Sequence, residues 1–259
     1  MYHGNSLGPE GNDYAAVQIL IKPDGKVVVR TALTEYGTGA ISGLAQMAAE
    51  TLGLPIDQFE LDRPDTASCQ ETGPTVASRV IVIGGRAAQL AAQKLKDKIL
   101  TVAGDLLHCN PSRLTTRDGL IRHPDDPGWT ISFEKVVEEC HKRHVSLTET
   151  GFYMAPKCEF DPENSQGTTY QQYTYGAVVA EVEVDTELGV VKPVKITVAY
   201  DVGRAINPLS LEGQIEGGTI QALGYGLMEQ LIHVDGIVAN PTLGDYYIPT
   251  SLDIPEIQT

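Results

Sequence analysis

The chain has 259 residues, of which 42% are hydrophobic and 20% are charged, and its formal net charge is −15. This length is enough to bury a substantial core in one large or two small domains. The acidic balance argues against a nucleic-acid partner, because a phosphate backbone binds basic surfaces. No apolar stretch reaches the length of a membrane span, and we expect a cytoplasmic protein without a membrane segment.

The first predicted elements are a hairpin, a glycine-bearing turn and a helix. Two β-rich runs, Ala15–Ile21 and Lys26–Ala32, flank Pro23-Asp24-Gly25, which is a typical hairpin turn. A turn over residues 34–39 (TEYGTG) follows, and a helix is predicted over Ala40–Leu52. Gly53 and Pro55 are the residues expected to end it.

A long helix is predicted next. Apolar residues recur at three- and four-residue steps from Val76 to Ile99, which is the pattern of one buried helix face. We expect the segment from Gly73 to Arg79 to open this helix. A turn-rich stretch follows, and then a short helix over Phe133–His144 with Ser132 as its N-cap.

The last part of the chain repeats the first in plan. Ala177–Asp185 and Val190–Tyr200 form a second predicted hairpin, and residues 201–218 lead into a helix that we expect to open at Gly217-Gly218 and to end near Leu231. Antiparallel hairpins with helices beside them favour an α+β fold over a doubly wound parallel sheet. The predicted organisation is a loose segment 1–13, a first lobe 14–150, a connector 151–173 and a second lobe 174–259.

Candidate metal sites are weak. The four cysteines contain no CxxC pair, so neither a disulfide framework nor a cysteine-ligated metal is indicated. His141 and His144 lie three residues apart without a third ligand, which is typical of a polar helix end.

The turn at Gly37-Thr38-Gly39 allows two interpretations. With Ser42 in place of a third glycine, it resembles a partial dinucleotide-binding fingerprint, and Asp57 lies near the distance of a ribose-binding acid. The preceding strand, however, is the second arm of a hairpin and not the start of a βαβ unit, which equally favours a simple tight turn before a helix.

Residues 201–218 carry the most specific pattern. They combine an Asn207-Pro208 break with Gln214 and the pair Gly217-Gly218, and a helix that began at these glycines would present bare backbone amides to an anion. A close helix–helix contact that excludes side chains would explain the glycines equally well.

The segments DVGRAINP and EGQIEGG within residues 201–218 resemble the molybdopterin-binding subunit of the xanthine dehydrogenase/aldehyde oxidase family, the molybdenum hydroxylases. The resemblance implies a fold of the molybdenum-cofactor-binding-domain type with two similar hairpin–helix lobes. It implies that Gly37, Gly39 and Ser42 hold the pterin cofactor, with Thr38 in place of the family's glutamine. It also implies a turn around the dianionic end of the cofactor, and a contact to the pterin amide edge. The residues of that turn are Thr75, Ala77, Ser78 and Arg79, and those of the pterin contact are Gln214 and Gly217.

The same resemblance implies a function for the parent protein. Such enzymes use molybdopterin, here expected in its cytosine dinucleotide form with molybdenum, to hydroxylate a purine, another N-heterocycle or an aldehyde with oxygen from water. The opening residues 4–19 and the TEYGTG turn resemble the purine-oxidising bacterial branch. The family's catalytic glutamate belongs to a segment beyond the stretch Tyr246–Thr250, so Glu216 is not expected to be the base.

We therefore expect a fragment or split piece that helps to bind the cofactor and is inactive alone. Its implied partners are the missing N-terminal and C-terminal parts of the subunit, and the FAD and iron–sulfur subunits of the parent complex. Exposed surface at the cut should favour self-association. Two alternatives remain: a scaffold or assembly paralogue that keeps the fold without the cofactor, favoured by Thr38, and a nicotinamide-binding enzyme that uses residues 37–42.

Overall fold

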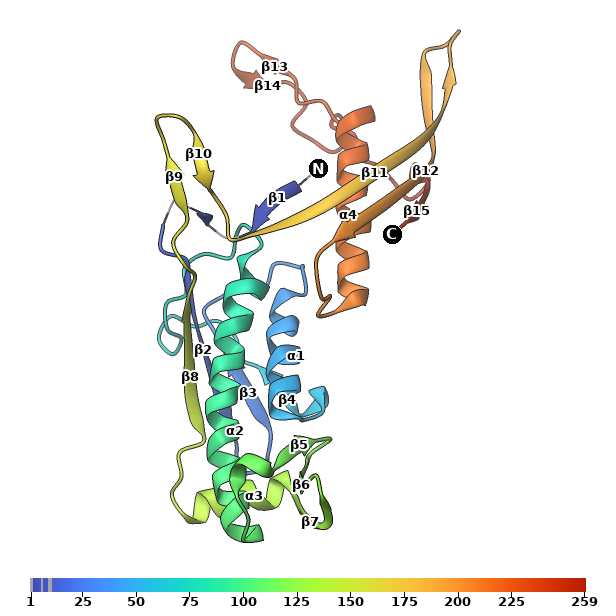
Figure 1. Cartoon of the computed structure of the whole chain (residues 1–259). Helices are drawn as coiled ribbons and strands as arrows, with labels where there is room; N and C mark the ends of the chain where they lie inside the picture. Colours follow the sequence, from blue (N-terminus) through green and yellow to red (C-terminus); the bar gives the residue numbers. More distant parts are fainter. Residues whose placement is uncertain (1, 6, 9–10) are drawn as a thin grey trace. The chain divides into compact units, whose positions relative to one another are not determined.

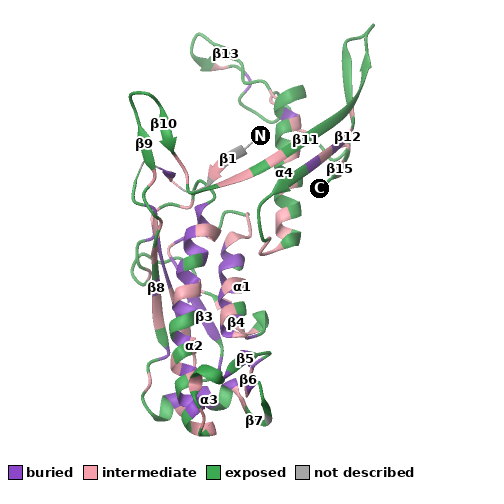
Figure 2. Ribbon diagram, in the orientation of Figure 1, coloured by how far each residue is buried: buried purple, intermediate pink, exposed green. Residues whose placement is uncertain are grey.

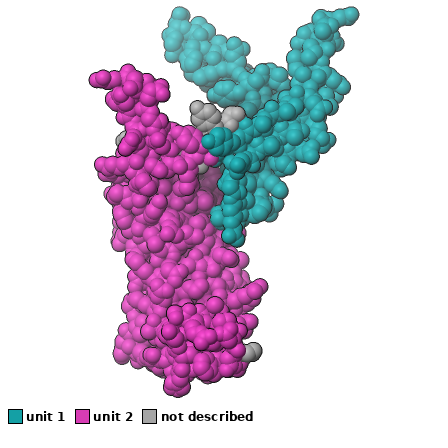
Figure 3. Space-filling view, viewed as in Figure 1, with its two compact units in different colours: residues 1–3, 174–259 teal, residues 4–173 magenta. Residues whose placement is uncertain are grey.

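The computed structural model describes residues 2–5, 7–8 and 11–259; residues 1, 6, 9 and 10 lie outside the described part. The chain divides into two compact units (Figure 3), and each is described by itself. Residues 4–173 form the large unit, and residues 1–3 with 174–259 form the small unit.

The large unit contains most of the regular structure (Figure 1). Its strands are β2 (Tyr14–Ile21), β3 (Val27–Arg30), β4 (Phe59–Leu61), β5 (Thr115–Arg117), β6 (Leu120–His123), β7 (Asp126–Ser132), β8 (Thr148–Met154), β9 (Glu159–Asp161) and β10 (Gln166–Thr168). Its helices are α1 (Ala40–Leu52), η2 (Ile56–Gln58), η3 (Val80–Gly84), α2 (Gly85–Leu107), η4 (Pro111–Arg113) and α3 (Phe133–Lys142).

A four-stranded sheet with the order β4-β3-β2-β8 forms one layer of the large unit. β2 pairs antiparallel with both β3 and β8, and β4 is added parallel to β3. Helix α2 packs against β2 and β8, and α1 packs against α2. Both helices begin at the same end of the unit (Figure 1), which brings the turns that precede them to one end.

The core lies between this sheet and the two helices. Ala15, Val17, Ile19 and Ile21 alternate along β2 and are buried, which is the period-two pattern of a strand with one covered face. The facing stripe of α2 is rich in alanine, and small side chains allow the helix to lie close to the sheet. Figure 2 shows the buried residues concentrated in these layers. The stripe consists of Ala87, Ala88, Ala91, Ala92, Leu95 and Ile99.

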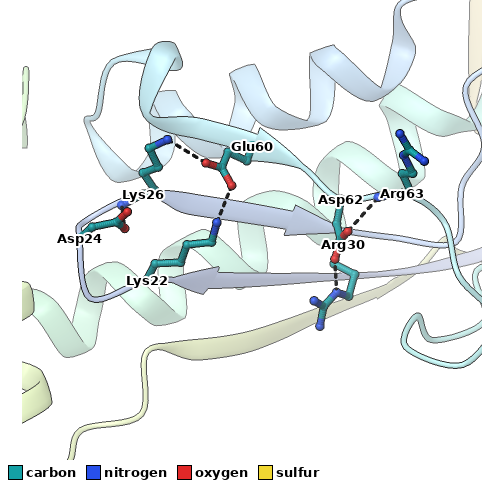
Figure 4. Close-up of polar contacts among 7 residues, drawn as sticks. All are labelled: Lys22, Asp24, Lys26, Arg30, Glu60, Asp62 and Arg63. Atoms are coloured by element: carbon teal, nitrogen blue, oxygen red, sulfur yellow. Dashed lines mark hydrogen bonds and ion pairs between the residues drawn. The ribbon is translucent and has the colours of Figure 1, made fainter.

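Ion pairs join β4 to the rest of the sheet (Figure 4). The Glu60 carboxylate accepts from Lys22 Nζ at 2.5 Å and from Lys26 Nζ at 3.0 Å, and Asp62 accepts from Arg30 Nε at 2.8 Å. These hydrogen bonds lower the pKa values of Glu60 and Asp62. Each pair is partly exposed and therefore weak, but the pairs connect β4 to the hairpin along the β3–β4 register.

The helices of the large unit agree with the sequence prediction except at the start of the long one. α1 covers Ala40–Leu52 as predicted, and α3 begins after Ser132, whose hydroxyl accepts from the amide of Lys135. The expectation that Gly73–Arg79 opens the long helix is wrong. Ala77 and Ser78 have φ values of 52° and 56°, in the left-handed region, and a π-helical turn, η3, precedes α2.

The small unit is built on a second hairpin, β11 (Gln172–Asp185) with β12 (Val190–Asp201). Its sheet has the order β1-β11-β12-β15, where β1 is Tyr2–Asn5 and β15 is Glu256–Gln258. Helix α4 (Pro208–Leu227) follows the hairpin, and β13 (His233–Val234) pairs with β14 (Ile237–Val238). Hairpin followed by helix thus occurs in both units, and the predicted α+β class is confirmed.

The small unit has little core of its own. Ile196 and Val198 of β12 are its buried apolar side chains in the described residues. Large apolar residues on β11, β12, α4, β13 and β14 stay uncovered, and Figure 2 shows most of the unit as exposed. Among them are Val179 (61% exposed), Leu209 (79%) and Tyr225 (77%). A hairpin and a helix with so much apolar surface need a further covering layer for independent stability.

Two segments predicted without regular structure contain some. The connector 151–173 includes the end of β8 and a small hairpin of β9 with β10. The segment 1–13 includes β1 and the buried Asp13, while residues 1, 6, 9 and 10 of that segment lie outside the described part.

Candidate functional site

The turn before α1 is organised around one carboxylate. Glu35 Oε1 accepts from the backbone amides of Gly37 (2.8 Å), Thr38 (2.6 Å) and Gly39 (3.1 Å), and Oε2 accepts from the amide of Ile41 at 3.1 Å. Gly37 and Gly39 have φ values of 108° and 74°, which side chains disfavour, and this conformation turns the amides toward one point. We call residues 35–41 with this set of bonds the Glu35 turn.

The hydrogen bonds are strong enough to change the acidity of Glu35. Partial burial acts to raise its pKa, but the amides of Ile41, Gly37, Gly39 and Thr38 together outweigh that effect and lower the pKa below its ordinary value. The carboxylate is therefore held ionised at the start of α1, where the helix dipole also favours a negative charge.

Thr38 uses its side chain within the same turn. Its hydroxyl is 3.2 Å from Glu35 Oε1, to which it donates, and it accepts from the amide of Ala40 at 3.4 Å. Ser42, in the first turn of α1, is exposed. The Glu35 turn thus offers a ligand its carbonyl groups, the Ser42 hydroxyl and few free donors.

One observation supports and one opposes the nucleotide-fingerprint interpretation of residues 37–42. The strand before the turn, β3, is the second arm of a hairpin with β2 as expected, but it also pairs parallel with β4, which follows α1, so the expectation that it begins no βαβ unit is wrong. The amides that would receive a pyrophosphate in such a motif are bound to Glu35.

The turn before η3 lies beside the Glu35 turn. The hydroxyl of Thr75 accepts from the amide of Thr34 at 2.8 Å, and the two hydroxyls are 3.4 Å apart. Ala77 and Ser78 are exposed and consecutive in the left-handed region. In the described part of the chain, the amides of residues 76–78 donate to no protein acceptor. We call residues 73–79 the Ser78 turn.

Arg79, the last residue of the Ser78 turn, is a buried charge. Its guanidinium is 1% exposed and donates through Nε to Asp13 Oδ1 and through Nη1 to the carbonyl of Pro74, both at 2.7 Å. Nη2 donates to the carbonyl of Tyr14. The side chain therefore fixes both ends of the turn, and any role of Arg79 toward a ligand acts through the turn's shape.

Gln214 and Gly217 belong to the small unit, where the predicted helix start is wrong. α4 begins at Pro208, and the Asn207 side chain accepts from the amide of Ser210 at 3.1 Å as the N-cap. Asn-Pro is a typical N-cap and first-turn pair, and this signal was available in the sequence. The amides of Gly217 and Gly218 lie inside the helix and are not presented to an anion.

The glycines of α4 instead make one part of the helix surface flat. Gln214 and Gly217 are both exposed, and a Cβ added at Gly213, Gly217 or Gly218 would meet nothing within 4 Å. Such a surface allows close approach of another group, and Gln214 can both donate and accept there.

The stretch that follows α4 is fixed by polar contacts. The hydroxyl of Tyr246 donates to Glu229 Oε2 at 2.7 Å, and this bond raises the pKa of Tyr246. The buried Asn240 accepts from the amide of Ile232 at 2.9 Å and donates to the carbonyl of Gln230 at 2.6 Å. Sequence patterns did not identify Asn240 or Glu35, because a single polar residue produces no periodic pattern, whether it is buried or lies in a loop.

Eight of the ten predicted site residues thus lie in the large unit, in or next to the Glu35 turn and the Ser78 turn. They are Gly37, Thr38, Gly39, Ser42, Thr75, Ala77, Ser78 and Arg79. Within the described residues, no group of three or more histidine, cysteine or acidic side chains could hold a metal ion. None of the described helices has the length and apolar character needed to cross a membrane.

Comparison with known proteins gives a consistent set of relatives. The molybdopterin cofactor-binding domain family matches residues 1–255. The chain is 30% identical over 259 residues to the xanthine dehydrogenase molybdenum-binding subunit of Escherichia coli O157:H7, covering 97% of this chain and 33% of that protein. It is 29% identical over 254 residues to aldehyde oxidase 2 of Macaca fascicularis, covering 97% and 17%.

Among solved structures, quinoline 2-oxidoreductase from Pseudomonas putida 86 superposes with a TM-score of 0.86 at 28% identity, over 100% of this chain and 33% of that one. The CO dehydrogenase of Oligotropha carboxidovorans shares the fold, with a TM-score of 0.87 at 23% identity, over 100% of this chain and 32% of that one. The chain spans a third or less of the length of these relatives. By fold and by sequence, it belongs to the molybdopterin cofactor-binding domain family of the molybdenum hydroxylases.

Proposed function

We propose that the chain forms part of the cofactor cradle of a xanthine-dehydrogenase-like molybdenum hydroxylase, and that it holds molybdopterin in the cytosine dinucleotide form. The observation that carries the proposal is the hydrogen bond from the Thr34 amide to the Thr75 hydroxyl. It fixes the Glu35 turn and the Ser78 turn side by side, so that one extended ligand can contact both.

The donors of the two turns suit different parts of such a ligand. The Ser78 turn combines three amides without a protein acceptor with the hydroxyl of Ser78, which are groups that bind phosphate oxygens. In the Glu35 turn, the carboxylate of Glu35 already accepts from the backbone amides. The residues around it, Gly37, Thr38, Gly39 and Ser42, therefore suit the uncharged pterin side. In the small unit, the side-chain amide of Gln214, beside Gly217 on the flat part of α4, can both donate and accept, which is what the edge of a pterin requires.

When bound, the cofactor supplies the redox chemistry of hydroxylation, and the protein contributes binding, orientation and proton transfer. We propose a purine, another N-heterocycle or an aldehyde as the substrate class of the whole enzyme, supported by the names of the relatives. We assign the proton-accepting glutamate to a further segment of the subunit. Glu216 lies exposed on α4 between the glycines, and the 259 residues alone are expected to show no turnover.

The same proposal includes the partners and the compartment. The uncovered apolar surface of the small unit is the expected contact for further N-terminal and C-terminal parts of the subunit, and FAD and iron–sulfur subunits complete the electron path. We place the complex in the cytoplasm. Without its partners the chain should self-associate through this surface, and sedimentation at micromolar concentration tests this; a clean monomer would contradict it.

Cofactor content tests the proposal directly. We would produce the full chain with its genetic neighbours in a host that makes the cofactor, and release and identify the bound nucleotide. Ser78→Ala should lower the retained cofactor, because a hydrogen bond to a charged group contributes about 1.5–3 kcal/mol. Ser146→Ala, at an exposed serine far along the chain, is the control. Equal cofactor content in the two variants would remove Ser78 from the site.

A non-catalytic scaffold is the second candidate, and the Glu35 turn favours it. The amides of residues 37–39 and the Thr38 hydroxyl are occupied within the protein, so this turn has few donors left for a cofactor. This alternative predicts that the complete complex contains no molybdopterin. A stoichiometric cofactor in the purified complex would exclude it.

A further inference from the structure

The Glu35 turn has the geometry of an anion site that is already filled. Four amide donors, from Gly37, Thr38, Gly39 and Ile41, point at the two oxygens of one carboxylate over distances of 2.6 to 3.1 Å. Each amide has a single proton to donate. A phosphate could use these donors only after the carboxylate had left.

The occupant is covalently attached and cannot diffuse away. Glu35 is separated from the first of its partners, Gly37, by a single residue, so its effective concentration at the nest is high and independent of solution conditions. A second anion that approached the occupied turn would also meet the negative charge of the carboxylate.

We infer that Glu35 acts as an internal anion that closes the start of α1 to phosphate, and so determines which part of a ligand this turn accepts. The turn then takes neutral hydrogen-bonding groups, and an anionic group is directed elsewhere. The identity of that ligand rests on the proposed function, but the closure itself does not.

A purely structural role for Glu35 would make a different prediction. A carboxylate that merely caps the helix can be lost with a fall in stability and no new binding property. A carboxylate that closes an anion site leaves behind a nest that small anions can fill. The two roles therefore differ in what the protein binds after the side chain is shortened.

The test is a titration of the full chain and of Glu35→Ala with sodium formate and, separately, inorganic phosphate, followed by amide NMR. In Glu35→Ala we expect saturable shifts of the Gly37, Thr38, Gly39 and Ile41 amides with both anions, and a rise in melting temperature with formate. Wild type should show neither the amide shifts nor the rise in melting temperature. Glu50→Ala, which removes an exposed glutamate at the other end of α1, should behave like wild type.

A second variant keeps the inference testable if Glu35→Ala does not fold. Glu35→Gln retains the size and one acceptor oxygen but not the negative charge that repels a second anion, so its four amides should respond to phosphate, whereas those of wild type should not. Equal phosphate responses in wild type and Glu35→Gln, or a folded Glu35→Ala that binds neither anion, would overturn the inference. No cofactor is used, so a failure here is distinct from a failure of the cofactor-content experiment.

Discussion

Arg79 and Asp13 form a buried ion pair, with Nε of the guanidinium 2.7 Å from Oδ1 of the carboxylate and side chains that are 1% and 5% exposed. The second oxygen, Oδ2, accepts from the amide of Leu7 at 2.8 Å. The pair connects the residues before β2 to the Ser78 turn, 66 positions later in the chain. The shape of a candidate ligand-binding turn therefore depends on a buried ion pair.

Removing one member of this pair should strongly destabilise the large unit. Arg79→Met leaves Asp13 buried without its counter-ion, and we expect a loss of about 3–5 kcal/mol in the free energy of unfolding. Urea unfolding followed by the fluorescence of Trp129, the single tryptophan, measures it. Arg86→Met, at an exposed arginine of α2, should change stability by no more than about 0.5 kcal/mol.

The double variant separates a lost charge partner from lost packing. Asp13→Leu combined with Arg79→Met leaves no orphan charge, so it should cost less than the sum of the two single changes. A double variant whose loss equals that sum would mean that the two side chains act independently.

Gly151 of β8 should tolerate no side chain. A Cβ there would overlap the carbonyl oxygen of Ala87 and lie 2.6 Å from the amide nitrogen of Ala91, both on the backbone of α2. Gly151→Ala must push helix and sheet apart, and overpacking of this kind costs roughly 1–3 kcal/mol or more. Gly11→Ala, where the added Cβ meets nothing within 4 Å, is the control. Similar urea midpoints for the two variants would show that α2 does not lie this close to β8.

The cysteines should differ in reactivity. Cys140 is fully buried in α3, and burial is the main cause that raises the pKa of its thiol, so little reactive thiolate forms. Cys69, Cys109 and Cys158 are partly exposed. With iodoacetamide and peptide mass spectrometry, we expect these three to be alkylated in the native protein and Cys140 only after unfolding. Early alkylation of Cys140 would indicate local opening of α3.

Sequence periodicity predicted the parts of the fold in which local signals and packing agree. The α1 boundaries follow from a helical pattern ended by Gly53, and both hairpins follow from alternating strands around tight turns. The start of the long helix was misplaced because Val76 continues its apolar period. The left-handed turn at Ala77 and Ser78 depends instead on Arg79, which is held by Asp13 and Tyr14 far away in the sequence.

The candidate site was predictable as a set of turns but not as a network. Glycine spacing and the family resemblance marked residues 37–42 and 75–79. Sequence could not show that a neighbouring carboxylate fills the first turn, because that depends on the direction of four amides in space. In α4, Gly217-Gly218 was predicted as the helix start, but Asn207-Pro208 is the stronger helix-start signal and marks the true one.

The last prediction concerns the stability of the protein at acidic pH. Because the folded-state pKa of Glu35 is lowered, the unfolded chain takes up a proton at a higher pH than the folded one does. Its stabilising contribution is therefore present above the ordinary carboxyl pKa and is lost as the pH falls through the lowered value. The stability difference between wild type and Glu35→Gln should shrink steadily below about pH 4.5, measured by urea unfolding at low salt.

Comparison with the variant is necessary because Glu60 and Asp62 also have lowered pKa values and titrate in the same range. Their contributions cancel in the difference between wild type and Glu35→Gln, since both proteins contain them. Glu50→Gln provides the control, because Glu50 lies in the last turns of α1, where the helix dipole does not stabilise a negative charge. A difference for Glu35→Gln that stayed constant from neutral pH to pH 3 would mean that the amides of the Glu35 turn do not favour the ionised carboxylate.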